Sequence, residues 1–325
     1  MREHPLINAV HVVPKMELKA APLRALRGPA RDLVREIRAQ AYDIAIDVQG
    51  LTKSAAWGWL AGIPRRFGLA RPDSREVAPL LATELVAPRP DRLHVVERNL
   101  ELLRPLGIEP PARATFPVHL SPAAQTRAGE LLGDDPTPLV LMTCGAGWAT
   151  KRWPPDRFGR LARLLVDRHG CRVGLTWGPG EEPLVQQALE AAGGGTAHFD
   201  APALPAGPGV HALPGTTFME LGAAIARAQL FVGGDTGPTH FAAALGVPCV
   251  AMMGPLDACR NGPYGERSIT IQHAVPRRPP RGVNHREWCD PATRMENITV
   301  EDVLEACEAQ LVRHAPSIQS DSVTP

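Results

Sequence analysis

Short apolar runs alternate with amphipathic segments along the chain. Residues 230–232 predict a buried strand, glycines follow, and residues 238–245 predict a helix with Pro238 at its first position. A second apolar run at residues 247–253 completes a strand–helix–strand unit. Such units are typical of parallel sheets, which bind ligands at the carboxyl ends of their strands.

The same pattern recurs on both sides of this unit. Apolar runs at residues 139–142 and 173–177 are each followed by small residues, and residues 42–47 predict another strand after an amphipathic helix at 31–41. These repeats predict an α/β protein. Further helices are predicted at residues 94–106, 155–169, 217–228 and 300–312.

Chain length predicts two domains, because 325 residues exceed the usual size of a single core. A proline-containing passage between residues 117 and 138 separates the two sets of elements, so we place the domains at residues 1–137 and 138–325. The first domain begins unusually. Residues 9–13 predict a short strand with no strand–helix unit before it.

Composition, net charge and cysteine pattern indicate the general class of protein. The 44% apolar and 21% charged content is typical of a soluble globular protein, and the net charge of +1 disfavours bulk binding of nucleic acid. The six cysteines include no C-x-x-C pair, which indicates reduced thiols rather than a zinc site or a disulfide framework. No apolar run approaches about 20 residues. We therefore expect a cytoplasmic protein that meets any membrane-bound substrate from the surface.

Polar and small residues gather where the predicted strand at 230–232 turns into its helix. Asp235, Thr236 and Gly237 occupy this turn, and His240 follows in the first helical turn. The free N–H groups of a helix start favour an anion. Glycines with a capping Asp and Thr would also serve a plain tight turn, but such a turn needs no imidazole.

Two other turns carry candidate chemistry. The loop at residues 143–154 combines small residues with Lys151, which suits a phosphate, although it matches neither a P-loop nor a complete dinucleotide fingerprint. Glu181 and Glu182 follow the next predicted strand and suit ribose hydroxyls or an amine. The same two acids would equally be favoured by a helix dipole.

Basic residues follow the predicted strand at residues 42–47. They are Lys53, Arg65, Arg66 and Arg75. Guanidinium groups pair bidentately with carboxylate and phosphate, so this set is a candidate site for an anionic substrate. A solvated basic face is the alternative.

Four separated stretches together resemble the bacterial heptosyltransferases of glycosyltransferase family 9. They are residues 46–55, 151–154, 177–182 and 234–240, the last with Gly254 and Pro255. The likeness extends from about His4 to Val312. It implies the GT-B fold, in which two Rossmann-like domains face each other across a cleft.

The resemblance also implies the contacts of a nucleotide-sugar donor, ADP-heptose. Lys151 matches the lysine that meets the donor phosphates, and Glu181, or Glu182 after a one-residue shift, matches the acid at the ribose. Thr216 falls where the family lines its adenine pocket. The residues that surround diphosphate and sugar are matched by Asp235, Thr236, Gly237 and His240.

The implied reaction is inverting sugar transfer to an anionic glycolipid of the lipopolysaccharide-core type at the inner face of the cytoplasmic membrane. Lys151 and the N–H groups after Gly237 would stabilise the leaving diphosphate. No Asp-x-Asp motif indicates a metal, so we expect no cofactor. The acceptor would meet the four basic residues of the first domain, and the protein would act as a monomer.

One departure from the family changes this expectation. Family members begin with a strand and a Gly-Asp turn whose aspartate is the proposed general base, whereas this sequence starts after them. We therefore expect a first domain that lacks its first βαβ segment and a chain that binds ADP but transfers sugar poorly. No general base is assigned, and Asp47 is the first residue to test.

Three alternatives remain beside this interpretation. The first is a non-catalytic nucleotide-sugar-binding protein, because the donor-binding half of the sequence is complete and the acceptor-binding half is not. A GT-B enzyme that uses a UDP-sugar is the second. A nicotinamide oxidoreductase is disfavoured, because the sequence has no complete G-x-G-x-x-G followed by an acid about 20 residues later.

Overall fold

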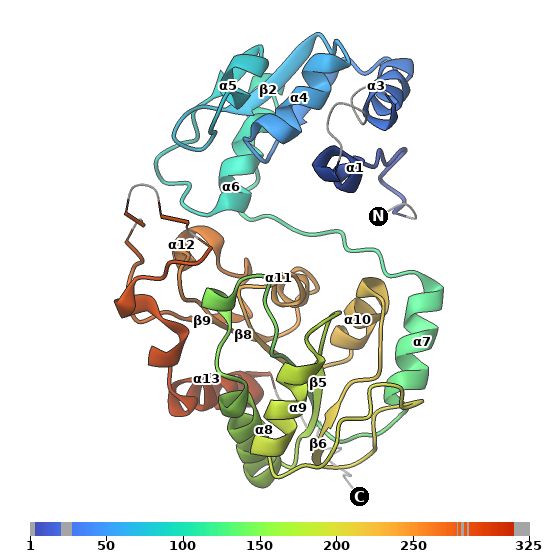
Figure 1. The fold of residues 1–325 in the computed structure, drawn as a ribbon, viewed down its shortest axis with the longest axis vertical. Helices are drawn as coiled ribbons and strands as arrows, with labels where there is room; N and C mark the ends of the chain where they lie inside the picture. The colour runs from blue at the N-terminus through green and yellow to red at the C-terminus, as the bar shows by residue number, and fades with distance from the viewer. Residues whose placement is uncertain (1–3, 21–27, 278, 281–282, 285, 315–325) are drawn as a thin grey trace, which may run out of the picture. The chain divides into compact units, whose positions relative to one another are not determined.

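The computed structural model describes residues 4–20, 28–277, 279–280, 283–284 and 286–314, and it is an α/β protein (Figure 1). Compactness divides the chain into residues 1–114 and 115–325, which we call the first and second units.

This division lies before the expected domain boundary at residues 137 and 138. The difference is due to helix α7 (Pro122–Leu132), which lies beside α10 (Phe218–Ile225) in the second unit (Figure 1). The apolar side of α7 is fully buried there, with Leu131 in the same core cluster as Leu221.

The second unit contains a parallel sheet of six strands in the order β6-β5-β4-β7-β8-β9. This is the doubly wound order of Rossmann-like domains. Four of its strands are buried along their whole length, which explains the continuous apolar runs of the sequence. The strands are β4 (Leu139–Thr143), β5 (Arg172–Thr176), β6 (Gly209–Ala212), β7 (Leu230–Gly234), β8 (Cys249–Met252) and β9 (Ser268–Ile271).

Helices cover both faces of this sheet. One face packs against α8 (Pro155–His169), α9 (Glu182–Ala191) and α13 (Val300–Arg313), and the other against α7, α10 and α11 (Gly237–Ala244). The short elements of this unit are η2 (Ala149–Lys151), α12 (Ala258–Asn261), η3 (Pro291–Thr293) and η4 (Met295–Asn297). Several predicted helices are confirmed with their end signals. Gly170 adopts the left-handed conformation that ends α8, and Thr217 and Glu220 form the capping box of α10.

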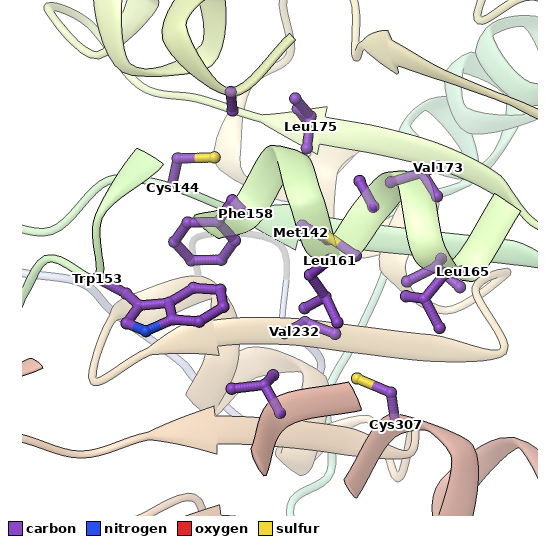
Figure 2. Close-up of a cluster of buried hydrophobic side chains, with 14 of the residues drawn as sticks. Met142, Cys144, Trp153, Phe158, Leu161, Leu165, Val173, Leu175, Val232 and Cys307 are labelled. Atoms are coloured by element: carbon purple, nitrogen blue, oxygen red, sulfur yellow. The ribbon is translucent and has the colours of Figure 1, made fainter. Parts of the chain in front are cut away.

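The larger core cluster fixes the loop that carries Lys151. Trp153, two residues further on, is fully buried and packs edge-to-face on Phe158 with ring centroids 4.9 Å apart (Figure 2). Its indole Nε1 donates a hydrogen bond to the carbonyl of Ile298, 2.9 Å away. Because this side chain is buried and its N–H is bonded, the loop end has a defined position.

A buried arginine links separate segments of the second unit by hydrogen bonds. The side chain of Arg172 is 3% exposed and donates hydrogen bonds to the carbonyls of Leu132, Leu204 and Pro205. It also lies 3.6 Å from the carboxylate of Asp135. The backbone N–H groups of Thr137 and Gly207 bond to Asp135 and lower its pKa to about 2, so this carboxylate is ionised at neutral pH.

The first unit holds a smaller parallel sheet in the order β1-β2-β3. The predicted strand at residues 42–47 and helices at 31–41 and 94–106 are found there with small shifts of their ends. The elements are α1 (Lys15–Ala20), α3 (Pro29–Ala39), β1 (Ile44–Asp47), α4 (Thr52–Leu60), β2 (Arg65–Leu69), α5 (Ala78–Leu81), β3 (Glu84–Val86), α6 (Val95–Leu100) and η1 (Glu101–Leu106).

The strand predicted at residues 9–13 is absent from the described part of this unit. His11 instead bonds through its ring nitrogens to the side chains of Glu36 and Tyr42, which holds the segment against α3 and the start of β1 without ladder pairing. Strand β1 is paired with β2 alone among the described residues, and Ile44 and Ile46 are each 37% exposed. The first sheet is therefore short and has an apolar edge.

No helix in the described segments combines the length and the apolar character that a membrane span requires.

Candidate functional site

A pocket of 440 Å³ opens at the carboxyl edge of the second sheet. Its walls come from the loops that follow β4, β5 and β7 and from the start of α10. Among the predicted site residues, Glu181, Thr216, Asp235, Thr236 and Gly237 line it. The parallel strands bring these segments to one edge although they lie up to about 90 residues apart.

Three charged or titratable side chains meet at one side of this pocket. The Lys151 ammonium lies 2.6 Å from Asp235 Oδ2, and His240 Nε2 lies 2.9 Å from Asp235 Oδ1. Lys151 Nζ also lies 4.3 Å from the centre of the Trp148 ring. The structure thus brings together residues from the turn before α8 and from the first turn of α11.

The environment of Asp235 keeps its carboxylate charged. Burial by itself raises the pKa of Asp235, but hydrogen bonds from His240 and Lys151 outweigh it and hold the pKa below its ordinary value. Asp235 is 10% exposed and Lys151 14% exposed. An anion that enters the pocket therefore meets an ammonium group already oriented by a fixed carboxylate.

The start of α11 offers hydrogen-bond donors to the same pocket. Thr236 is the N-cap residue, but no side chain in the described part of the chain caps the first N–H groups. Thr239 Oγ1 donates to the carbonyl of Gly234, 2.8 Å away, which fixes the turn. Uncapped N–H groups and the helix dipole make this end a site for a negatively charged group.

Glu181 lies on the loop that follows β5. Its Oε2 accepts a hydrogen bond from the N–H of Gly178, 2.9 Å away. A Cβ placed on Gly145 would lie 1.9 Å from the Glu181 carboxyl carbon, so only glycine leaves room for this carboxylate. Of the two predicted acids, Glu181 lines the pocket, whereas Glu182 begins α9.

An aromatic pair borders the pocket beside Thr216. Phe218 opens α10 and stacks on Phe241 with centroids 5.0 Å apart and the ring planes 8° from parallel. Phe218 is nevertheless 54% exposed. Sequence reasoning missed this residue, although the capping box at Thr217 and Glu220 already indicated that position 218 starts a helix.

The four basic residues of the first unit do not form one cluster. Arg65 and Arg66 begin β2, whereas Lys53 and Arg75 lie beside the loop that leaves the carboxyl end of β1. Because β1 and β2 are parallel, these two pairs lie at opposite edges of the sheet. The expectation that all four gather near one strand end is therefore corrected.

The two arginines of β2 also have protein partners. Arg65 pairs with Glu84 at 3.1 Å and lies over the Phe67 ring. Arg66 donates to the carbonyls of Ile63 and Leu81. Arg66 therefore holds the sheet to its neighbouring segments.

A family model described as glycosyltransferase family 9 (heptosyltransferase) matches residues 30–287. The chain belongs to this family. Its α/β architecture with parallel sheets is that of the GT-B enzymes in the family, as the resemblance of its motifs implied.

Relatives of this family 9 glycosyltransferase cover most of the chain. Lipopolysaccharide heptosyltransferase 1 of Pseudomonas aeruginosa is 29% identical over 84% of this chain and 72% of the relative. Lipopolysaccharide heptosyltransferase 3 of Escherichia coli is 28% identical over 98% of this chain and 87% of the relative. The solved structure of the E. coli heptosyltransferase WaaC with ADP is 26% identical, covers 92% of this chain and 82% of that one, and superposes with a TM-score of 0.67.

Within the described residues of the glycosyltransferase, no group of three or more His, Cys, Asp or Glu side chains is arranged to hold a metal ion. The six cysteines are free thiols. Glu181 and Asp235 line the pocket, and Asp235 holds Lys151 and His240 beside it.

The contact between Gly145 and Glu181 gives a direct test of the pocket. We expect Gly145→Ala to displace the Glu181 carboxylate and to weaken ADP binding about tenfold or more, because a charged hydrogen bond is lost. Titration calorimetry measures this. Gly195→Ala is the control, since a Cβ there meets no described atom within 4 Å. Equal ADP affinity in the Gly145→Ala variant and the wild type would contradict the assigned position of Glu181.

Proposed function

We propose that this family 9 glycosyltransferase transfers a heptose from ADP-heptose to an anionic acceptor of the lipopolysaccharide-core type, with inversion at the anomeric carbon. The observation that carries the proposal is the ammonium of Lys151 held by Asp235 beside the uncapped start of α11. The names of the relatives support the sugar and the acceptor, and the WaaC structure with ADP supports the nucleotide.

The departure of a diphosphate determines which protein groups the reaction needs. An acceptor hydroxyl oxygen attacks the anomeric carbon while the bond from this carbon to the diphosphate oxygen breaks. The bond's electron pair goes to ADP, so negative charge grows where Lys151 and the α11 N–H groups provide donors. Stabilising that growing charge lowers the barrier more than binding the ground state does.

The other residues at the pocket would contact different parts of the donor. Glu181 accepts hydrogen bonds and so fits the ribose hydroxyls, while Thr216 borders the part that would hold the base. Asp235 orients both Lys151 and His240, and we expect the imidazole to face the sugar side of the diphosphate. These roles use the residues that the sequence singled out.

The acceptor hydroxyl must also lose its proton to a base. Asp47 ends β1 at the carboxyl edge of the first sheet, where its carboxylate accepts from the N–H of Gln49 at 3.1 Å. We propose it as the first carboxylate to replace. Lys53 and Arg75 lie near the same edge and would attract an anionic glycolipid at the inner face of the cytoplasmic membrane, where the protein would act as a monomer.

A nucleotide-sugar-binding protein with weak transfer activity is the second candidate. The contrast between the two units favours it, because the donor pocket lies on a six-stranded sheet while the described first sheet has three strands and an exposed apolar edge. Loss of a positioned base typically lowers a rate about 100- to 10,000-fold.

Calorimetric titration with ADP, UDP and NAD tests the proposed donor. We expect ADP to bind most tightly, because the similar structure of E. coli WaaC was solved with ADP. A tighter complex with UDP or NAD would overturn the proposal. Incubation with ADP-heptose and a core oligosaccharide then separates the two candidates, and the anomeric configuration of any product reports inversion or retention.

A further inference from the structure

A buried hydroxyl in the pocket has no hydrogen-bond partner within the described part of the chain. Thr176 is the last residue of β5 and is 1% exposed. Its Oγ1 makes no hydrogen bond to any described residue, although Thr176 lines the 440 Å³ pocket. Buried polar atoms without partners are rare in native proteins and are costly, so the position calls for a partner that is not part of the chain.

The strand register places Thr176 away from the charged end of the pocket. Thr176 pairs with Thr143 on β4, and β4 in turn pairs with β7, which leads to Asp235. Two strand spacings separate β5 from β7, which is a distance of about 10 Å. A nucleoside whose diphosphate lies at the start of α11 extends across such a distance towards Thr176.

The wall of the same pocket contains apolar and aromatic residues. The next residue, Trp177, packs edge-to-face on Phe199, and its indole N–H already donates to the carbonyl of Leu213 at 2.8 Å. A Cβ on Gly215 would lie 3.6 Å from the Trp177 ring, so the loop before Thr216 lies against this indole. Apolar surface with one unsatisfied hydroxyl is the combination that binds and orients a base.

We infer that the Thr176 hydroxyl hydrogen-bonds the base of the bound nucleotide. A hydroxyl both donates and accepts, so it can pair with a ring nitrogen or with an exocyclic amine. The bond forms only in the complex, and nucleotide binding therefore relieves the unsatisfied hydroxyl. This inference rests on the proposed donor, and it adds a base-contacting residue that neither the motifs nor the charged groups of the pocket indicate.

The first test replaces the hydroxyl by a methyl group of the same shape. Thr176→Val is expected to raise the Kd for ADP about three- to tenfold while leaving the thermal stability of the free protein equal or higher, since an unpaired buried hydroxyl is removed. Thr176→Ser retains a hydroxyl and is expected to bind ADP more tightly than Thr176→Val.

A matched control comes from another buried threonine. Thr293 is 3% exposed, but its hydroxyl donates to the carbonyl of Asp290 at 3.2 Å and it does not line the pocket. Thr293→Val is expected to lower the thermal stability and to leave the Kd for ADP unchanged. The two valine variants therefore have opposite patterns of stability and affinity.

Ribose 5-diphosphate, which has no base, identifies the part of the ligand that Thr176 contacts. Its affinity is expected to be the same for Thr176→Val and the wild type. If Thr176→Val binds ADP as tightly as the wild type, or weakens ADP and ribose 5-diphosphate equally, the inference is overturned while the proposed donor stands. If the wild type itself does not bind ADP, the proposed function fails first.

Discussion

Lys151→Ala is expected to weaken ADP binding by about 2 kcal/mol or more, which is about thirtyfold in Kd. The ammonium is largely buried and lies beside the uncapped start of α11, so its charge acts on a diphosphate with little screening by water. Transfer of the sugar is expected to slow by at least the same factor, because charge on the diphosphate increases as it leaves.

Controls separate this effect from a loss of structure. Lys151→Ala also leaves Asp235 with His240 as its remaining partner, so the thermal stability of each variant is measured beside its affinity. Lys53→Ala removes an ammonium of the first unit and is expected to leave ADP binding unchanged. An unchanged Kd in Lys151→Ala would remove the phosphate role from this residue.

Arg172→Met is expected to lower the free energy of unfolding of the second unit by about 3–5 kcal/mol. The substitution keeps an unbranched apolar side chain, but it leaves three carbonyl groups and the carboxylate of Asp135 without the guanidinium. Urea unfolding followed by tryptophan fluorescence measures the change, since Trp153 and Trp177 lie in this unit.

Arg163→Met is the matched control for this prediction. Arg163 also pairs with an aspartate, Asp167, but it lies on the surface of α8 with 58% of its side chain exposed. Exposed pairs four residues apart contribute about 0.3–0.5 kcal/mol. If the two variants unfold at the same urea concentration, the network around Arg172 does not stabilise the fold as argued.

The central strands of the second unit could be predicted because they are buried on both faces. Strands β4, β5 and β7 consist of nearly continuous apolar runs, and the turns after them contain the glycines and prolines that end one element and begin the next. The outer strands β6 and β9 were missed. Each has only four residues, so the alternation of polar and apolar residues in β9 is too short to separate it from the surrounding loops.

The position of Glu181 and Asp235 at one edge of this sheet could be predicted for the same reason, since both follow predicted strands. Their partners could not be found, because the ion pair between Lys151 and Asp235 joins positions 84 residues apart, and the room that Gly145 leaves for Glu181 depends on neighbouring loops. The predicted clustering of the four basic residues was wrong because it did not take the direction of the strands into account. Arg65 and Arg66 follow α4 in sequence, yet they begin a parallel strand and so lie at the opposite edge.

The unequal cores of the two units affect how heating experiments on this chain are interpreted. Among the described residues, the first unit buries its apolar side chains in two separate clusters of four, whereas the second has two much larger clusters. Cores of such different size melt at different temperatures, and a two-domain chain has no single two-state transition. A calorimetric trace is therefore expected to contain a weak early transition and a strong late one, and only the late one reports on the nucleotide pocket.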